Sequence, residues 1–316
     1  MKESYEIVII GGGPAGLTAG LYACRARMKT LLLEKALCGG QILVTDTIEN
    51  FPGFPEGIKG PDLAEWMFKQ ASHAGLEVKA LEVAKVASKK GSQPLFSIDA
   101  TGAETIETLS IIIASGANWN ALGIPGEKEL TGRGVSYCAT CDGPLFKGKE
   151  VVVIGGGDTA IEDALFLTKF AGKVTVVHRR GRLRATKILQ ERALANSRIE
   201  FSFNSVATAI SGTKRCEGVT VKDVNTGAEH TIKASGVFVL IGMSPNSGFA
   251  KGVVTMDEKG YIVCDDDMKT SADGIFACGD VRKKSLRQVV TAAGDGATAA
   301  FSAQHYVERL KGVEYK

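Results

Sequence analysis

The chain has 316 residues, which is more than one hydrophobic core usually serves, so its length predicts two domains. Hydrophobic residues make up 44% and charged residues 23%, as in a water-soluble globular protein. The net charge of +3 gives no sign of nucleic-acid binding, and no apolar run reaches the roughly 18 residues that a membrane span needs.

The first predicted elements are a strand, a glycine-rich turn, a helix and a second strand. Residues 5–10 are apolar, GGGPAG follows at 11–16, helical patterning runs to about residue 26, and TLLLE at 30–34 is the second strand. Glycines in such a turn let a pyrophosphate approach the N–H groups at the start of the helix. Glu34 ends the second strand, where its carboxylate would accept hydrogen bonds from ribose hydroxyls. This unit is predicted to bind a dinucleotide with a free 2′-hydroxyl.

A second unit repeats this order after a strand at 110–117 closes the first sheet. EVVVI at 150–154 is followed by GGGDTA at 155–160, a helix through residue 170 and the strand KVTVVH at 173–178. One G-x-G-x-x-G alone is a weak signal. Two copies, each between a β-rich run and a helical run, predict an internal repeat.

The spacing within the two copies is the same. Glu34 follows Gly11 by 23 positions, and His178 follows Gly155 by the same number. Arg179 and Arg180 come directly after His178, and guanidinium groups bind phosphate oxygens in a bidentate way. A solvated basic turn is the alternative interpretation, but the register with Glu34 favours a clamp for a 2′-phosphate and hence NADPH.

The last part of the chain is predicted to return to the first domain. A strand at 237–242 closes the second sheet, GIFACGD follows at 274–280, and an alanine-rich helix runs from about 286 to 311 without a third nucleotide motif. We therefore expect an α/β protein with two Rossmann-like domains, the second inserted into the first. The predicted domains are 1–117 with 246–316, and 118–245.

Two of the seven cysteines form a close pair in SYCATCDGPLF, Cys138 and Cys141. A structural zinc needs four ligands, and no second cysteine pair or clustered histidines accompany this one, so no metal is predicted. A reversible disulfide needs only these two thiols, and Asp142 would exchange a proton with a thiolate, serve as a turn residue, or both. The other five cysteines are isolated, which favours free thiols and a cytoplasmic protein.

The motifs GGGPAG, CATCDG, GGGDTA, HRRxxxR and GIFACGDV occur in this order along essentially the whole chain. In this it resembles the low-molecular-weight thioredoxin reductases of bacteria. The resemblance implies a homodimer in which hydride passes from NADPH to FAD, and electrons then pass to the Cys138–Cys141 disulfide. The dithiol would reduce thioredoxin or a thioredoxin-like protein. Because Cys141 is the nearer of the two to Asp142, we expect it to face the flavin and Cys138 to attack the partner.

The resemblance also implies site residues. For FAD they are Gly11, Gly13, Pro14, Ala15, Gly16, Glu34, Lys35, Gly40, Gln41, Asn50, Gly279, Asp280, Arg287, Gln288 and Val289. For NADPH they are Gly155, Gly157, Asp158, Thr159, His178, Arg179, Arg180 and Arg184. The catalytic residues are Cys138, Cys141 and Asp142.

One departure and two rival functions remain open. Many members of the family follow CATCDG with two aromatic residues, whereas this chain has Pro144 and Leu145, so a thioredoxin-like partner stays an alternative. A dithiol oxidase of the same fold would run the cysteine pair with oxygen, although it would have no need of the HRRxxxR clamp. The other rival is a non-catalytic FAD and NADPH redox sensor.

Overall fold

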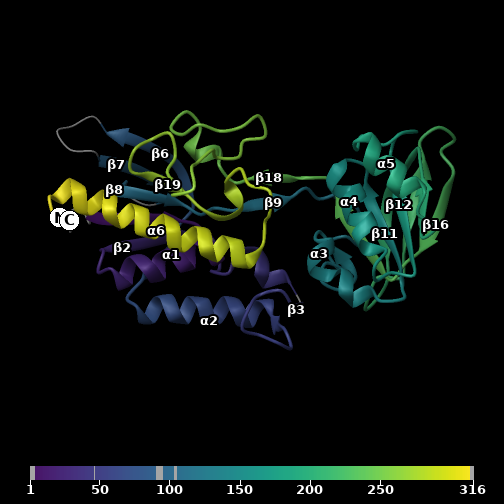
Figure 1. The fold of residues 1–316 in the computed structure, drawn as a ribbon, viewed down its shortest axis with the longest axis horizontal. Helices are drawn as coiled ribbons and strands as arrows, with labels where there is room; N and C mark the ends of the chain where they lie inside the picture. The colour runs from purple at the N-terminus through teal and green to yellow at the C-terminus, as the bar shows by residue number, and fades with distance from the viewer. Residues whose placement is uncertain (1–3, 46, 90–94, 103–104, 314–316) are drawn as a thin grey trace. The chain divides into compact units, whose positions relative to one another are not determined.

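The computed structural model describes residues 4–45, 47–89, 95–102 and 105–313. The chain forms two compact units (Figure 1): unit 1 comprises Met1–Asn118 and Ser244–Lys316, and unit 2 comprises Trp119–Met243. Unit 2 is therefore inserted between the two parts of unit 1. These limits lie next to the divisions expected from the sequence, while the dinucleotide bound by each unit stays a prediction.

Unit 1 is built on a mixed sheet in the order β5-β2-β1-β8-β7-β6, with β19 also paired to β8. The pairs among β5, β2, β1, β8 and β19 are parallel, and those of β7 with β6 and β8 are antiparallel. The parallel core is buried and aliphatic, as expected for strands covered on both faces. The seven strands of the whole mixed sheet are β1 (Ser4–Ile10), β2 (Thr30–Glu34), β5 (Glu77–Ala80), β6 (Val83–Lys89), β7 (Leu95–Ala100), β8 (Ile106–Ile113) and β19 (Ile275–Ala277).

Helices α1 and α6 lie side by side in unit 1 (Figure 1). Glycine permits this approach, because a Cβ on Gly296 would lie 2.2 Å from the carbonyl oxygen of Ala15. Helix α6 begins at Val289 rather than near residue 286, because Gln288 has an extended backbone and serves as its N-cap. The remaining elements are α1 (Pro14–Arg25), α2 (Gly60–His73), α6 (Val289–Lys311), short helices η1 (Gly40–Val44), η3 (Gly248–Ala250) and η4 (Gly279–Val281), and strands β3 (Thr47–Ile48) and β4 (Ile58–Lys59).

Unit 2 contains a parallel five-stranded sheet in the order β10-β17-β11-β12-β13 and an antiparallel three-stranded sheet, β14-β15-β16. Helix α4 ends at Leu167, earlier than expected, because a turn at 168–170 leads back toward β12. The strands are β10 (Val135–Ser136), β11 (Glu150–Gly155), β12 (Lys173–Val177), β13 (Ile199–Ser202), β14 (Ser205–Ser211), β15 (Gly218–Asp223), β16 (Glu229–Lys233) and β17 (Gly236–Leu240). The helices are α3 (Ala139–Asp142), η2 (Gly143–Phe146), α4 (Asp158–Leu167) and α5 (Lys187–Leu194).

The chain passes between the units through β9 (Ala117–Trp119) and β18 (Met243–Pro245), which pair as a two-stranded sheet. The sequence predicts one continuous strand at 110–117, but β8 stops at Ile113. Gly116 has a φ of +68°, a left-handed conformation that interrupts a strand, and β9 starts after it.

Candidate active site

The glycine-rich turn of unit 1 joins β1 to α1. Its glycines are not all needed for the same reason. A Cβ on Gly11 would lie 2.5 Å from Ala114 O, and one on Gly16 would lie 1.8 Å from Gly11 O, so these two are required by packing within the chain. The nearest atom to a Cβ on Gly13 is Gly40 Cα at 4.0 Å. Packing does not explain Gly13, and the open space beside the start of α1 suits a ligand phosphate.

Glu34, at the carboxyl end of β2, supports this turn. Its Oε2 accepts a hydrogen bond of 2.7 Å from the N–H of Gly12, and its Oε1 accepts one of 3.0 Å from the N–H of Ala36. The side chain stays partly exposed, so it retains accepting capacity for a ribose hydroxyl. Burial, followed by the nearby Glu34 charge, raises the pKa of the Cys38 thiol to about 11.

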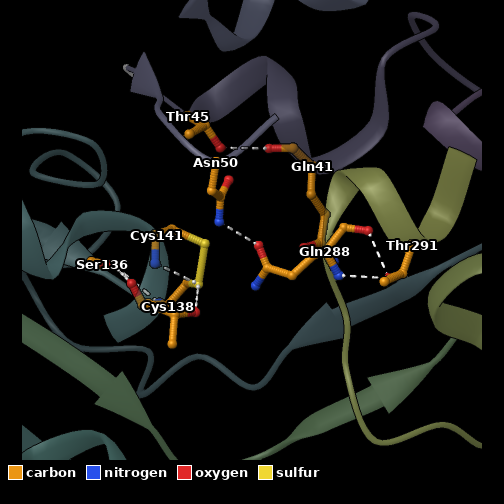
Figure 2. The surroundings of a disulfide bond; sticks show 9 residues. Gln41, Thr45, Asn50, Ser136, Cys138, Cys141, Gln288 and Thr291 are labelled. Carbon is orange, nitrogen blue, oxygen red and sulfur yellow. Dashed lines mark hydrogen bonds between the residues drawn. A yellow bond between two sulfur atoms is a disulfide. The ribbon is translucent and has the colours of Figure 1, made fainter. Parts of the chain in front are cut away.

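The other predicted FAD residues all lie in unit 1. Gln41 is the second residue of η1, directly after Gly40, and donates its amide to the carbonyl oxygen of Ala117. Figure 2 shows Asn50 donating to Oε1 of Gln288, at 2.9 Å. Lys35 forms an ion pair of 3.7 Å with Glu82 that is exposed on both sides.

Asp280 lies in η4, directly after β19. Among the described residues its Oδ1 has no hydrogen-bond partner although it is buried, and burial raises the pKa of its carboxyl, with Lys284 and Arg287 opposing the shift. Arg287 Nε donates to the Asp280 carbonyl oxygen at 3.4 Å, and its guanidinium lies 4.2 Å from the ring centre of Tyr261. A buried acceptor without a partner is costly, and a hydroxyl of a bound ligand would satisfy it. The residues present therefore fit a flavin dinucleotide.

In unit 2 the second glycine-rich turn joins β11 to α4. His178, just after β12, is 6% exposed, and its Nδ1 lies 3.0 Å from Gly155 O. A Cβ on Gly156 would lie 2.2 Å from the same nitrogen, so the imidazole packs directly against the turn. Burial lowers the pKa of this imidazole, so it stays neutral near pH 7.

The arginines after β12 carry the positive charge of this site. Arg179, Arg180 and Arg184 are exposed, and none of them has an ion-pair partner in the part of the chain that the structure describes. A Cβ on Gly157 would lie 3.8 Å from a terminal nitrogen of Arg184, which brings this guanidinium to the start of α4. Asp158 accepts a hydrogen bond of 2.7 Å from Thr186 N, and Thr159 is exposed beside it. These unpaired cations at a helix N-terminus fit a phosphorylated dinucleotide.

Cys138 and Cys141 form a disulfide at α3, with Cα atoms 5.3 Å apart (Figure 2). The N–H of Cys141 donates to Cys138 Sγ at 3.2 Å, and the N–H of Cys138 donates to Ser136 Oγ at 3.1 Å. Both cysteines are half-buried rather than enclosed in the core. Asp142 is the last residue of α3, so the helix carries all three predicted catalytic residues at its two ends.

Helix α4 packs against α3 in the same unit and carries Asp163. Burial, followed by the charge of the adjacent Glu162, raises the pKa of Asp163 from 3.8 to about 6, and a hydrogen bond from the Ala139 backbone opposes the shift. A carboxyl that titrates near neutrality therefore lies against the first residue of the cysteine helix.

Two kinds of feature are not found in the described ranges. No group of three or more His, Cys, Asp or Glu side chains there is placed to bind one metal ion. None of the helices in those ranges combines the length and apolar character needed to cross a membrane.

Residues 5–296 match the family described as pyridine nucleotide-disulphide oxidoreductase. The chain belongs to this family. A protein of Bacillus subtilis named thioredoxin reductase is 48% identical over 98% of this chain and 97% of its own, and one of Treponema pallidum with the same name is 45% identical over 98% and 100%. The crystal structure of thioredoxin reductase from Streptococcus pyogenes matches with a TM-score of 0.93 and 44% identity over 98% of this chain and 100% of that one.

These similarities confirm the predicted α/β fold of two dinucleotide-binding domains and identify the chain as an oxidoreductase enzyme. The structure gathers the residues predicted for FAD in unit 1, and those predicted for NADPH in unit 2 with the cysteine pair. Their contacts with the two dinucleotides stay predictions.

Sequence reasoning missed several residues that support the turns. Asp295, Arg282 and Lys284 form a buried ion cluster beneath η4, and Cys38 packs its sulfur against Gly12. The available signal for the cluster was a single acidic residue in the small-residue run TAAGDGATAA, together with three consecutive cations after GDV. Nothing in the sequence around Cys38 indicated that its sulfur would pack against the turn at Gly12.

Proposed function

We propose that this chain is an NADPH-dependent thioredoxin reductase, with FAD in unit 1 and NADPH in unit 2. The observation that carries the proposal is the half-buried Cys138–Cys141 disulfide on the same unit as an unpaired arginine cluster. The relatives named thioredoxin reductase cover nearly the whole chain and support a thioredoxin as substrate. They give no support to the oxidase or the sensor.

The exposed guanidinium groups of Arg179 and Arg180 would bind the 2′-phosphate of NADPH, and Arg184 would add charge at the start of α4. In unit 1, Glu34 and Asp280 would accept hydrogen bonds from hydroxyl groups of FAD, and the open face of Gly13 would admit its pyrophosphate. The chemistry that FAD supplies when bound is the transfer of two electrons between NADPH and the disulfide.

The two sulfurs have different tasks in the reduced enzyme. The N–H of Cys141 points at Cys138 Sγ and would stabilise a thiolate there. Cys138 Sγ attacks the partner's disulfide, which forms a mixed disulfide and releases one partner thiolate. Cys141 then attacks Cys138 Sγ, re-forms the intramolecular disulfide and releases the second partner thiolate. Asp142, directly after Cys141, is the candidate for the accompanying proton transfer.

The setting of the enzyme is also part of the proposal. The five cysteines outside the pair are all free in the structure, which supports a reducing compartment and hence the cytoplasm. The motif resemblance supports a homodimer, and Leu145, exposed after the cysteine helix, leaves a thioredoxin-like partner as an alternative substrate.

Cys138→Ser tests the proposal, because it removes the partner-attacking sulfur and leaves both dinucleotide sites intact. We expect the variant to retain FAD, NADPH to bleach the flavin absorption, and thioredoxin reduction to fall by about 1,000-fold or more. Cys216→Ser, which replaces a free cysteine of unit 2 outside both proposed sites, is the control and should keep full activity. Retained thioredoxin reduction in Cys138→Ser, or a wild-type protein without bound flavin, would overturn the proposal.

A further inference from the structure

Asp295 is a largely buried carboxylate on α6 with three donors. Its Oδ2 accepts hydrogen bonds from Lys284 Nζ at 2.7 Å and from the N–H of Gly279 at 3.0 Å, and its Oδ1 accepts one from Arg282 at 3.2 Å. The side chains of Asp295 and Arg282 are 12% exposed, and that of Lys284 is 11% exposed. A charged group is rarely buried unless it is paired, and here one carboxylate serves two cations and a backbone amide.

The amide that Asp295 holds belongs to a constrained turn. Gly279 has a φ of +74°, and a Cβ there would lie 2.8 Å from the Cβ of Ala15. Ala15 is in the first turn of α1, two residues after the open glycine Gly13, and it also lies against the backbone of α6 at Gly296. The first turn of α1, the η4 turn and the second turn of α6 therefore meet at Ala15, and the Asp295 bond fixes one of them.

The next residue, Asp280, is fixed at its backbone from the other side. Arg287 Nε donates to its carbonyl oxygen at 3.4 Å, while Asp295 holds the preceding amide. With the backbone held at both positions, the buried Oδ1 of Asp280 is left as an acceptor without a partner among the described residues. The two largely buried cations, Arg282 and Lys284, thus both pair with Asp295, while Oδ1 of Asp280 is the oxygen left without a partner in the described ranges.

We propose that Asp295 is a positioning residue of the flavin site: it holds the Gly279 amide and neutralises Arg282 and Lys284, so that Asp280 presents an oxygen to a hydroxyl of FAD. This inference rests on the proposed function, in which unit 1 binds FAD. It differs from a purely stabilising role, because a stabilising ion pair can be replaced by apolar side chains without loss of ligand affinity.

The double variant Asp295→Ala with Lys284→Met separates the two roles. It removes one negative and one positive charge together, and apolar replacement of a buried pair is often neutral for stability. Lys283→Met is the matched control, since Lys283 is the exposed neighbour of Lys284 and has no ion-pair partner in the described ranges. Asp295→Asn keeps the shape of the side chain and removes only its charge.

Full-length holoprotein of each variant is purified, and FAD release is followed by flavin fluorescence; the stripped chains are then titrated with FAD and unfolded in urea. We expect the dissociation constant for FAD to rise about 10- to 100-fold in the double variant and about 10-fold in Asp295→Asn, with Lys283→Met within about twofold of wild type. The urea midpoint of the stripped double variant should stay close to wild type, and its bound flavin absorption should shift toward that of free FAD.

Wild-type affinity for FAD in the double variant would overturn the inference while leaving the proposed function in place. Equal losses of FAD affinity and of the urea midpoint would show a stabilising role only, which also overturns it. If neither Asp295 variant folds, the carboxylate is a folding requirement and the inference fails. A wild-type protein that binds no FAD would instead remove the proposed function, and this inference with it.

Discussion

The glycine-rich turns of the two units have equal spacing but different support. In unit 1 the Glu34 carboxylate bonds to the N–H of Gly12 and stays partly exposed. In unit 2 the His178 ring packs against Gly156 and is almost fully buried. Both strand-end side chains thus hold the middle glycine; Glu34 stays partly exposed, and the buried Nε2 of His178 has no hydrogen-bond partner among the described residues. At the second site we expect the exposed Arg179 and Arg180 to discriminate between dinucleotides.

The largest expected effect tests whether Arg179 and Arg180 select NADPH over NADH. Replacing Arg179 and Arg180 with alanine would remove the two proposed charge-assisted contacts with the 2′-phosphate, so we expect the KM for NADPH to rise about 100-fold and that for NADH less than about threefold. Steady-state kinetics with both nucleotides measures this. Arg192→Ala, on the exposed face of α5, is the control. Equal losses for NADPH and NADH would remove the phosphate clamp from the comparison.

A second pair of variants tests whether each unit binds its own dinucleotide, by adding a methyl group to the glycine-rich turn of one unit at a time. Gly13 and Gly157 both have extended backbones that alanine adopts without strain, and neither is crowded by the chain itself. Gly13→Ala should weaken FAD binding about 10- to 50-fold and Gly157→Ala should do the same for NADPH, because the methyl group occupies ligand space. Fluorescence titration with each nucleotide measures both.

The two variants are controls for each other, because Gly13→Ala should leave the affinity for NADPH unchanged and Gly157→Ala should leave the affinity for FAD unchanged. Gly16→Ala provides the contrast, because its Cβ would clash with Gly11 O and should destabilise the protein itself. If Gly13→Ala and Gly157→Ala lose both nucleotides together, the assignment of one dinucleotide to each unit is wrong.

A smaller effect is expected for the strand-end residue of unit 1. Glu34→Gln keeps one acceptor oxygen and removes the charge that holds Gly12, so the dissociation constant for FAD should rise about fivefold. Titration of the stripped protein measures it, with Glu65→Gln, in an exposed ion pair on α2, as control. Unchanged FAD affinity would mean that Glu34 only shapes the turn.

The smallest effect concerns the pH dependence of the free energy of unfolding. It distinguishes α1 from α4, the two helices that follow the glycine-rich turns. Helix α1 has no acidic residue, whereas α4 carries Asp163 with a pKa raised from 3.8 to about 6, mainly by burial. A raised pKa means that the folded state binds the proton more tightly, so wild-type stability falls as the pH rises from about 4 to about 6.

Asp163→Asn should therefore unfold at higher denaturant concentration than wild type above about pH 6, by roughly 1–2 kcal/mol, with the difference vanishing below about pH 4. Urea titrations at several pH values measure it. Glu191→Gln, exposed on α5, should show no such trend. A difference that grows as the pH falls would contradict the burial of Asp163.

The sequence predicted those parts of the molecule that depend on local pattern. The alternation of apolar strand, glycine turn and helix located both units, because each turn needs small residues next to β1 and β11. It could not show that His178 is buried, since strand-end register says nothing of the direction of a side chain. Nor could it find Asp295, whose partners Gly279 and Arg282 lie more than ten positions away and meet it only after folding.

The pairing of β9 with β18 bears on how such a protein was assembled in evolution. The N–H of Asn120 bonds to Gly242 O at 3.0 Å, so the two ends of the inserted unit are neighbours. A module whose ends meet can enter a host at one surface loop without displacing the host's sheet. The whole segment between these ends can therefore be exchanged for that of a related chain at a single crossing point, without cutting a strand of the unit 1 sheet.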